Sequence, residues 1–224
     1  MTRTGPTWAI VPAKGFANAK QRLSTHLAPE RRHALAKAML CDVLAALAQV
    51  RELDGIALVT ADPAAASVGL SYGARVITEG ALNGHTAAVN NGAGILMREG
   101  CGAFLSIPGD VPLISSDEVR SILSALGQAP DFVIAPAHDG RGSNAILCAP
   151  PGAVPLSYGD DSFEPHLIAA RQAGIEPKVL RLPGVGLDID FIADLRAFMR
   201  VPSGTHTYEL LIAMRDELGE PASS

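Results

Sequence analysis

The sequence has few of the features that mark secreted or membrane-spanning proteins. It contains only three cysteines, Cys41, Cys101 and Cys148, and no two of them form a CxxC motif. No apolar run approaches the roughly 18–20 residues that a membrane span needs, and the N-terminus shows no basic segment followed by an apolar stretch. We therefore expect a soluble, cytoplasmic protein with reduced thiols, no disulfide framework and no structural zinc site.

An excess of positive charge is also missing. The chain has 18 Lys and Arg against 23 Asp and Glu, which gives a formal net charge of −5. Such a balance offers no basic field to nucleic acid or to an anionic membrane, so we expect neither as a partner. The chain does have a hydrophobic fraction of 48% over 224 residues. This is enough to build the core of a globular domain.

Short apolar runs alternate with amphipathic helical patterns along the chain. The predicted strands cover residues 8–12, 56–60, 75–78, 103–107, 131–135, 145–148 and 178–182. The predicted helices include one that starts at Pro29, one after Asp62, one after Ser115, and three over residues 85–99, 162–173 and 191–200. This alternation predicts an α/β fold in which helices cover both faces of a mostly parallel central sheet.

The domain organisation is predicted to be simple. We expect a single domain over residues 1–201, and residues 202–224 are expected to form a C-terminal tail or an added helix around residues 208–218. In open α/β sheets, ligands bind at the loops that follow the strands. Candidate functional residues are therefore sought in those loops.

The loop after the first strand contains three cations, Lys14, Lys20 and Arg22, among small residues. Such a loop can wrap a triphosphate with its side chains and backbone N–H groups. The alternative is an ordinary solvated basic loop. The loop carries neither GxxxxGK[ST] nor GxGxxG, so it is neither a P-loop nor a dinucleotide-binding turn.

Three carboxylates are candidates for a magnesium site. Asp110 ends a strand in a tight Gly-Asp turn, and Asp188 and Asp190 are two residues apart, so in extended chain both would face the same way. Carboxylates on separate loops suit Mg²⁺, which shares its ligands with phosphate oxygens. The alternatives are turn formation for Asp110 and a helix N-cap for Asp190.

Two segments rich in small polar residues could bind an anion. Residues 140–144 read GRGSN, and residues 158–162 read YGDDS before a predicted helix. Hydroxyl and amide groups near a helix N-terminus favour anion binding, whereas the alternative is two surface turns. His166, one turn into that helix, either orients the site or lies on the surface.

The ordered segments VPAK, AK-x-RL, PGDVPL, GSNAILCAPP, YGDDSFEPH and LDID resemble the guanylyltransferases of coenzyme F-420 biosynthesis over roughly residues 8–200. The resemblance implies a Rossmann-like nucleotidyltransferase fold of the GT-A-like type. It implies transfer of GMP from GTP to a phosphorylated three-carbon acid, with Mg²⁺ as cofactor and release of pyrophosphate. The product would pass to a downstream transferase, and a homodimer is an open alternative to a monomer.

The resemblance also assigns roles to individual residues. It assigns the triphosphate to Lys14, Lys20 and Arg22. We also expect Pro12 and Thr86 to bind nucleotide, and Lys20, Arg22 and Asp110 to be catalytic. The resemblance assigns magnesium to Asp110, Asp188 and Asp190, and acid binding to Asn144 or its neighbour Ser143, Gly159 and Ser162. The chain departs from the family pattern at His85-Thr86, where Leu-Asn is usual, and at Phe191-Ile192, where Thr-Pro is common.

The choice of acid is the finest prediction. The altered His85-Thr86 entry and the i, i+4 pair Met97 and Cys101 indicate a divergent, adaptable substrate pocket, although core packing would also explain the pair. On this basis we expect 3-phospho-D-glycerate first, 2-phospho-L-lactate second and phosphoenolpyruvate third. The alternatives are a nucleotidyltransferase for a sugar phosphate or molybdopterin, and a non-catalytic nucleotide-binding module.

Overall fold

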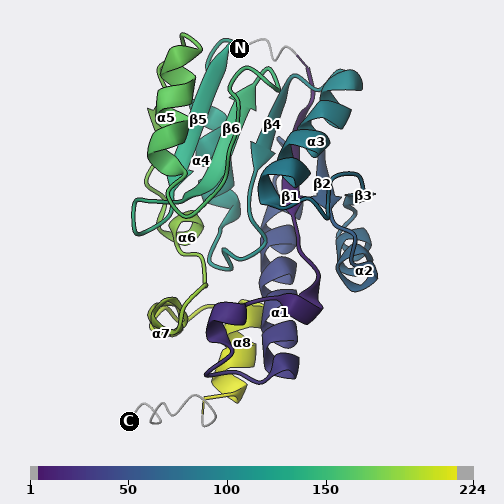
Figure 1. Cartoon of the computed structure of the whole chain (residues 1–224), viewed down its shortest axis with the longest axis vertical. Coiled ribbons are helices and arrows are strands. Elements are labelled where there is room, and N and C mark those ends of the chain that lie inside the picture. Colours follow the sequence, from purple (N-terminus) through teal and green to yellow (C-terminus); the bar gives the residue numbers. More distant parts are fainter. Residues whose placement is uncertain (1–4, 216–224) are drawn as a thin grey trace.

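A seven-stranded sheet forms the centre of the molecule in the computed structural model, which describes residues 5–215 (Figure 1). The strand order is β3-β2-β1-β4-β6-β5-β7. The strands are β1 (Thr7–Pro12), β2 (Gly55–Val59), β3 (Arg75–Ile77), β4 (Ala103–Ser106), β5 (Asp131–Pro136), β6 (Ser143–Ala149) and β7 (Lys178–Val179). β6 runs antiparallel to β4 and β5, and the other pairs are parallel. The predicted mostly parallel sheet is confirmed.

Helices cover both faces of this sheet, as predicted. They are α1 (Pro29–Ala48), α2 (Pro63–Ser71), α3 (His85–Arg98), α4 (Ser116–Ala125), α5 (Phe163–Gln172), α6 (Pro183–Gly186), α7 (Ile192–Met199) and α8 (His206–Ala213). Side chains of a strand alternate between faces: Val11 packs in the core with α1 and α4, whereas Ile10 packs in the core with α3 and α5. Figure 1 shows α3 and α5 in front of the sheet and α4 behind it.

The local start signals of two helices are confirmed. The Asp62 carboxylate accepts a hydrogen bond from Ala64 N–H at the start of α2, and Ser115 and Glu118 form the capping box of α4. The last predicted strand is shorter than expected: β7 ends at Val179, and Pro183 starts the short helix α6 shortly after it. These signals depend on neighbouring residues only, which is why sequence alone identifies them.

The hairpin of β5 and β6 contains an irregularity that matters for the site. Ala135 lies opposite Ala145, but Pro136 lies opposite Ser143, so Asn144 is an extra residue on β6. Such a bulge breaks the alternation of side chains. As a result, Ser143 faces His166 on α5, whereas Asn144 faces the carbonyl groups of α6 on the other side.

The C-terminal segment is an added helix rather than an extended tail over its described part. α8 packs against α1 and begins where the buried Asp42 carboxylate accepts hydrogen bonds from His206 N–H, from the His206 ring and from Thr207 N–H. Residues 216–218 of the predicted helix lie outside the described residues. Asp42 therefore caps α8 from a neighbouring helix.

Replacing Asp42 by Ala is expected to lower the free energy of unfolding by about 2–3 kcal/mol, because buried donors at the start of α8 lose their acceptor. Chemical denaturation followed by circular dichroism measures this loss. His206→Ala is the matched control, because it removes one half-exposed ring and leaves both backbone bonds in place. Equal stability of Asp42→Ala and the wild type would show that α8 does not depend on this cap.

Candidate active site

An open cleft of about 970 Å³ lies at one edge of the sheet. The C-terminal ends of β1 and β4 meet the N-terminal end of β6 there, because β6 runs in the opposite direction. This is the edge at which open α/β sheets bind their ligands. The volume lies in the range of pockets that hold small molecules and cofactors.

Most of the predicted site residues line this cleft. They are Pro12, Lys14, Lys20, Arg22, Thr86, Asp110, Ser143, Asn144, Gly159, Ser162, Asp188 and Asp190. They come from segments separated by as much as 178 positions in the chain (from Pro12 to Asp190). The topology of the sheet therefore brings together the basic loop, the carboxylates and the small polar residues.

Met97 and Cys101, which we predicted to bind substrate, lie elsewhere. α3 starts beside the cleft at His85, and Met97 is twelve residues further along it, which is roughly 18 Å at the rise of an α-helix. Met97 is half exposed. The buried Cys101 thiol donates to the carbonyl oxygens of Pro6 and Ala103. Both residues are corrected to positions outside the site.

Lys20 joins two of the carboxylates. Its ammonium group donates to Asp110 Oδ2 at 2.7 Å and to Asp190 Oδ1 at 2.9 Å, and its side chain is only 8% exposed. Burial acts to lower the pKa of Lys20, but the two carboxylates outweigh it and raise that pKa above its usual value. Lys20 is the one non-glycine residue with positive φ (52°) in the described chain, a strained backbone conformation.

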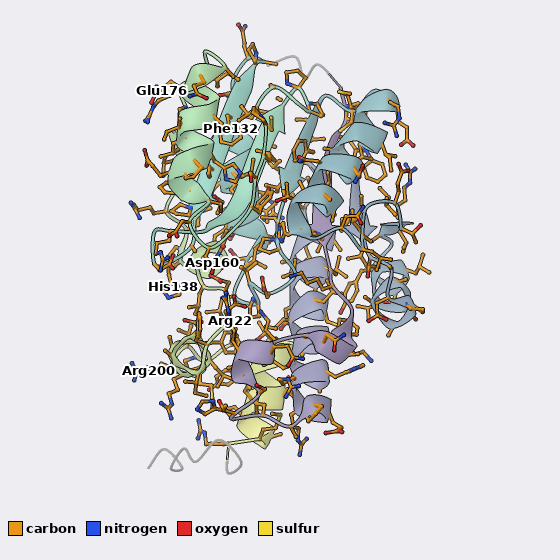
Figure 2. The ribbon with its side chains drawn as sticks, viewed as in Figure 1. Arg22, Phe132, His138, Asp160, Glu176 and Arg200 are labelled. Carbon is orange, nitrogen blue, oxygen red and sulfur yellow. The ribbon has the colours of Figure 1, made fainter. Side chains whose placement is uncertain are left out.

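Arg22 holds the rim of the cleft together. Its guanidinium group donates to Asp190 at 2.9 Å and to both carboxylate oxygens of Asp160, and it lies 4.9 Å from the centre of the Phe191 ring. Figure 2 shows Arg22 and Asp160 on the same side of the molecule, between the sheet and α8. Arg22 therefore links the loop after β1 to the loop before α5.

Asn144 holds Asp188 in place. The Asn144 side-chain amide donates to Asp188 Oδ1 at 3.0 Å and contacts the carbonyl oxygens of Val185 and Gly186. Burial raises the pKa of Asp188, and the nearby charge of Asp110 adds to this effect. The amide hydrogens of Asn144 are thus engaged within the protein. This leaves Ser143 as the better donor for an anion.

Asp190 does not cap α7, which was the alternative explanation for its presence. The carboxylate of Asp194 accepts from Asp190 N–H at 3.1 Å and from Phe191 N–H at 2.7 Å. Burial acts to raise the pKa of Asp190, but Lys20 and Arg22 outweigh it and hold that pKa below its usual range. Because the Asp194 carboxylate binds the backbone at the start of α7, the Asp190 carboxylate can face the cleft, where it pairs with Lys20 and Arg22.

The small polar residues form a connected network beside the N-terminus of α5. Ser162 Oγ donates to Ser143 Oγ at 3.2 Å, and Ser143 Oγ lies 2.9 Å from His166 Nδ1. Thr86, which we predicted to bind nucleotide, uses its hydroxyl to accept from Tyr158 N–H at 2.9 Å. Thr86 lines the cleft, and its bond also fixes the segment that precedes α5.

The carboxylates fit a divalent cation by their chemistry. Hard cations such as Mg²⁺ prefer oxygen ligands, and here the Lys20 ammonium group already lies between two of the carboxylates. Within residues 5–215, no three His, Cys, Asp or Glu side chains stand ready to hold a metal ion. The fit therefore requires the Lys20 side chain to leave its place between Asp110 and Asp190.

Sequence reasoning missed several residues of the site. Asp160 and Phe191 contact Arg22, and His138 lies with its Nδ1 3.9 Å from Asp188 and its Nε2 3.6 Å from Asp194. Asp194 alone had a readable signal, since an acidic residue at the third position of a helix often accepts from the backbone before it. The other contacts join distant segments and leave no local pattern.

The chain is similar in sequence to known guanylyltransferases. The family model described as "Guanylyl transferase CofC like" matches residues 7–222. The chain is 36% identical to the phosphoenolpyruvate guanylyltransferase of Conexibacter woesei, over 85% of this chain and 86% of that protein. It is 34% identical to the 2-phospho-L-lactate guanylyltransferase of Methanothermobacter thermautotrophicus, over 93% and 91%. It is 32% identical to the 3-phospho-D-glycerate guanylyltransferase of Colwellia psychrerythraea, over 83% and 88%.

A solved structure supports the fold. A protein from Desulfovibrio desulfuricans G20, described as a nucleotide-diphospho-sugar transferase, superposes with a TM-score of 0.77 at 19% identity, covering 95% of this chain and 96% of that one. None of the helices in residues 5–215 combines the length and the apolar character that crossing a membrane demands. The family match spans nearly the whole chain, and this protein belongs to the CofC-like guanylyl transferase family.

Proposed function

We propose that this guanylyltransferase transfers GMP from GTP to a phosphorylated three-carbon acid and releases pyrophosphate, as a step of coenzyme F-420 biosynthesis. The observation that carries the proposal is the convergence in one cleft of a basic loop, three carboxylates and the serine-lined N-terminus of α5. The relatives named above act, by their names, on three such acids. Each of these acids carries one phosphate and one carboxylate.

The basic loop and α5 suit the two substrates. Lys14, Lys20 and Arg22 would hold the triphosphate and stabilise the departing pyrophosphate, whose charge grows as it leaves. The N-terminus of α5, with Gly159 and Ser162 beside it, would hold the acid, because the N-terminal end of a helix attracts anions. The phosphate of the acid is already a competent nucleophile. The chain therefore needs to position it and need not supply a base.

The carboxylates of Asp110, Asp188 and Asp190 would hold Mg²⁺. When bound there, the metal offsets negative charge on the reacting phosphates. The chain's own part is to free these carboxylates, and Lys20 does so when its ammonium group moves from Asp110 and Asp190 to the triphosphate. Burial raises the pKa of Asp188, and the negative charge of Asp110 adds to this effect, so a nearby positive charge would stabilise the ionised carboxylate.

The expected order of the three acids was based on two pairs of residues. The first pair, Met97 and Cys101, lies outside the cleft and no longer supports that order. The second pair, His85 and Thr86, lines the cleft, but the His85 ring packs against the Tyr158 ring and the Thr86 hydroxyl binds the Tyr158 backbone. We therefore propose the substrate as a class, a three-carbon acid with one phosphate and one carboxylate. The product would pass to a downstream transferase.

A competition assay tests this proposal. The three acids, at equal concentration, are incubated with GTP and Mg²⁺, pyrophosphate is measured, and the products are identified by mass. We expect GTP-dependent pyrophosphate release and a guanylylated acid as product. A parallel reaction with a sugar 1-phosphate serves as control. Release of pyrophosphate with the sugar phosphate only, or with none of the acids, would overturn the proposal.

A further inference from the structure

We propose that His166 is a positioning residue that fixes the Ser143 hydroxyl as a hydrogen-bond donor toward the acid substrate. This inference rests on the proposed function, since it concerns the acid half of the same cleft. His166 lies on α5 and does not line the cleft itself. Its effect on the substrate therefore passes through Ser143.

The two hydrogen bonds of the His166 ring determine which ring nitrogen carries the proton. The backbone N–H of Ser157 donates to His166 Nε2 at 3.0 Å, so Nε2 must offer a lone pair. A neutral imidazole has one donor and one acceptor nitrogen. The proton is therefore on Nδ1, which donates to Ser143 Oγ at 2.9 Å.

The hydrogen bonds that Ser143 accepts determine where its hydroxyl hydrogen points. A serine oxygen has two lone pairs and one hydrogen, and Ser143 Oγ accepts from both His166 and Ser162. Its own hydrogen must then point to a third partner. Within residues 5–215 no protein acceptor is assigned to it, and Ser143 lines the cleft. The hydroxyl thus offers one donor to a ligand in the cleft.

The His166 ring is held rigidly in the required state. It is only 1% exposed, and burial lowers the pKa of His166 to about 4, so the ring is neutral near pH 7. The Tyr158 ring packs edge-on against it with centroids 5.1 Å apart. Thr86 in turn binds the backbone of Tyr158, so the first turn of α3 supports the position of His166.

A hydroxyl fixed as a donor suits a ligand group that only accepts hydrogen bonds. Carboxylate and ionised phosphate oxygens are such groups, and a hydrogen bond to a charged acceptor is stronger than one to a neutral acceptor. If His166 no longer donated, the Ser143 hydrogen could turn toward the protein. Binding of the acid would then be weaker, and binding of GTP would be unaffected.

Two conservative variants separate the two bonds of His166. His166→Asn places an amide nitrogen where Nδ1 was, so it retains the donor to Ser143 and loses the acceptor for Ser157 N–H. His166→Gln places its amide near the position of Nε2, so it retains a partner for Ser157 and loses the donor to Ser143. We expect His166→Gln to raise the KM for the acid about tenfold, the size of one lost hydrogen bond. We expect His166→Asn to raise it less than threefold.

The KM for GTP should stay unchanged in both variants, and thermal unfolding reports whether each one folds. In the Ser143→Ala background, His166→Gln should have no further effect on the KM for the acid, because the hydroxyl that it orients is gone. A purely structural role would give additive effects instead. Equal losses in the Asn and Gln variants, or additivity with Ser143→Ala, would overturn the inference.

A second measurement is independent of turnover. Nitrogen-15 NMR of the histidine rings at pH 7 should show His166 neutral and protonated at Nδ1 in the unliganded protein. A His166 ring protonated at Nε2 would overturn the inference even if the enzyme is active. If no acid is guanylylated while the Nδ1 tautomer is observed, the proposed function fails and the His166–Ser143 bond stands.

Discussion

Replacing Asp188 by Asn is expected to lower kcat roughly a thousandfold at saturating GTP and Mg²⁺, and Asp110→Asn should do the same. Both carboxylates line the cleft, and neither is needed to cap a helix. An amide keeps the size of the side chain and removes the charge that holds the metal. Asp190→Asn should also lower kcat, without unfolding α7, because Asp194 provides the cap.

Pyrophosphate release at several Mg²⁺ concentrations measures this effect. Asp117→Asn is a suitable control, because its carboxylate is 91% exposed and pairs with Arg120 on α4. We expect the control to retain full activity and all variants to unfold at nearly the same temperature. A near-normal rate for Asp188→Asn or Asp110→Asn would show that the carboxylate is no metal ligand.

Lys20→Ala is expected to lower kcat/KM for GTP about a hundredfold, because Lys20 would contact the triphosphate as its charge grows. The same change should strengthen the binding of Mn²⁺ to the nucleotide-free protein about tenfold. In the structure, the Lys20 ammonium group lies between Asp110 and Asp190. A metal ion that binds there must displace it, and in Lys20→Ala this competition is absent.

Titration with Mn²⁺, followed by electron paramagnetic resonance, measures metal binding without turnover. Lys14→Ala is the matched control: it removes the same charge from the same loop, and Lys14 lines the same cleft but forms no ion pair within residues 5–215. The control should bind Mn²⁺ like the wild type. Equal Mn²⁺ affinity of Lys20→Ala and the wild type would contradict competition between lysine and metal.

The elements that sequence reasoning identified are those with local signals. Asp62 before Pro63 and Ser115 before Glu118 mark helix starts through bonds within three residues, and buried strands show as short apolar runs. The direction of β6 has no such signal. Its pairing with β4 joins Leu105 to Leu147, and a buried strand reads the same in either direction.

In the candidate site, too, only the features with local sequence signals could be predicted. Lys20, Asp110 and Asp190 could be placed near one another, because each follows a strand or an apolar segment whose end lies at one edge of the sheet. The ion pairs among them could not be predicted from local sequence. Lys20 and Asp110 are separated by 90 positions in the chain, and Lys20 and Asp190 by 170 positions. The bulge at Asn144 was also invisible, because strict alternation would put Ser143 on the face of Ala145. The prediction that Met97 binds substrate was wrong for a simpler reason, because Met97 lies near the far end of α3 from the cleft.

The antiparallel hairpin divides the cleft between two parts of the chain. The parallel strands β1 and β4 supply the basic loop and Asp110, whereas the hairpin of β5 and β6, with the start of α5, supplies the serine network. Under the proposed function, the first part would face GTP and the second would face the acid. The two parts are joined by the ion pair of Arg22 with Asp160 and by the hydrogen bond between Thr86 and Tyr158. A lineage could exchange one three-carbon acid for another through substitutions in a single hairpin and one helix start, as long as those substitutions keep these two bonds to the GTP side.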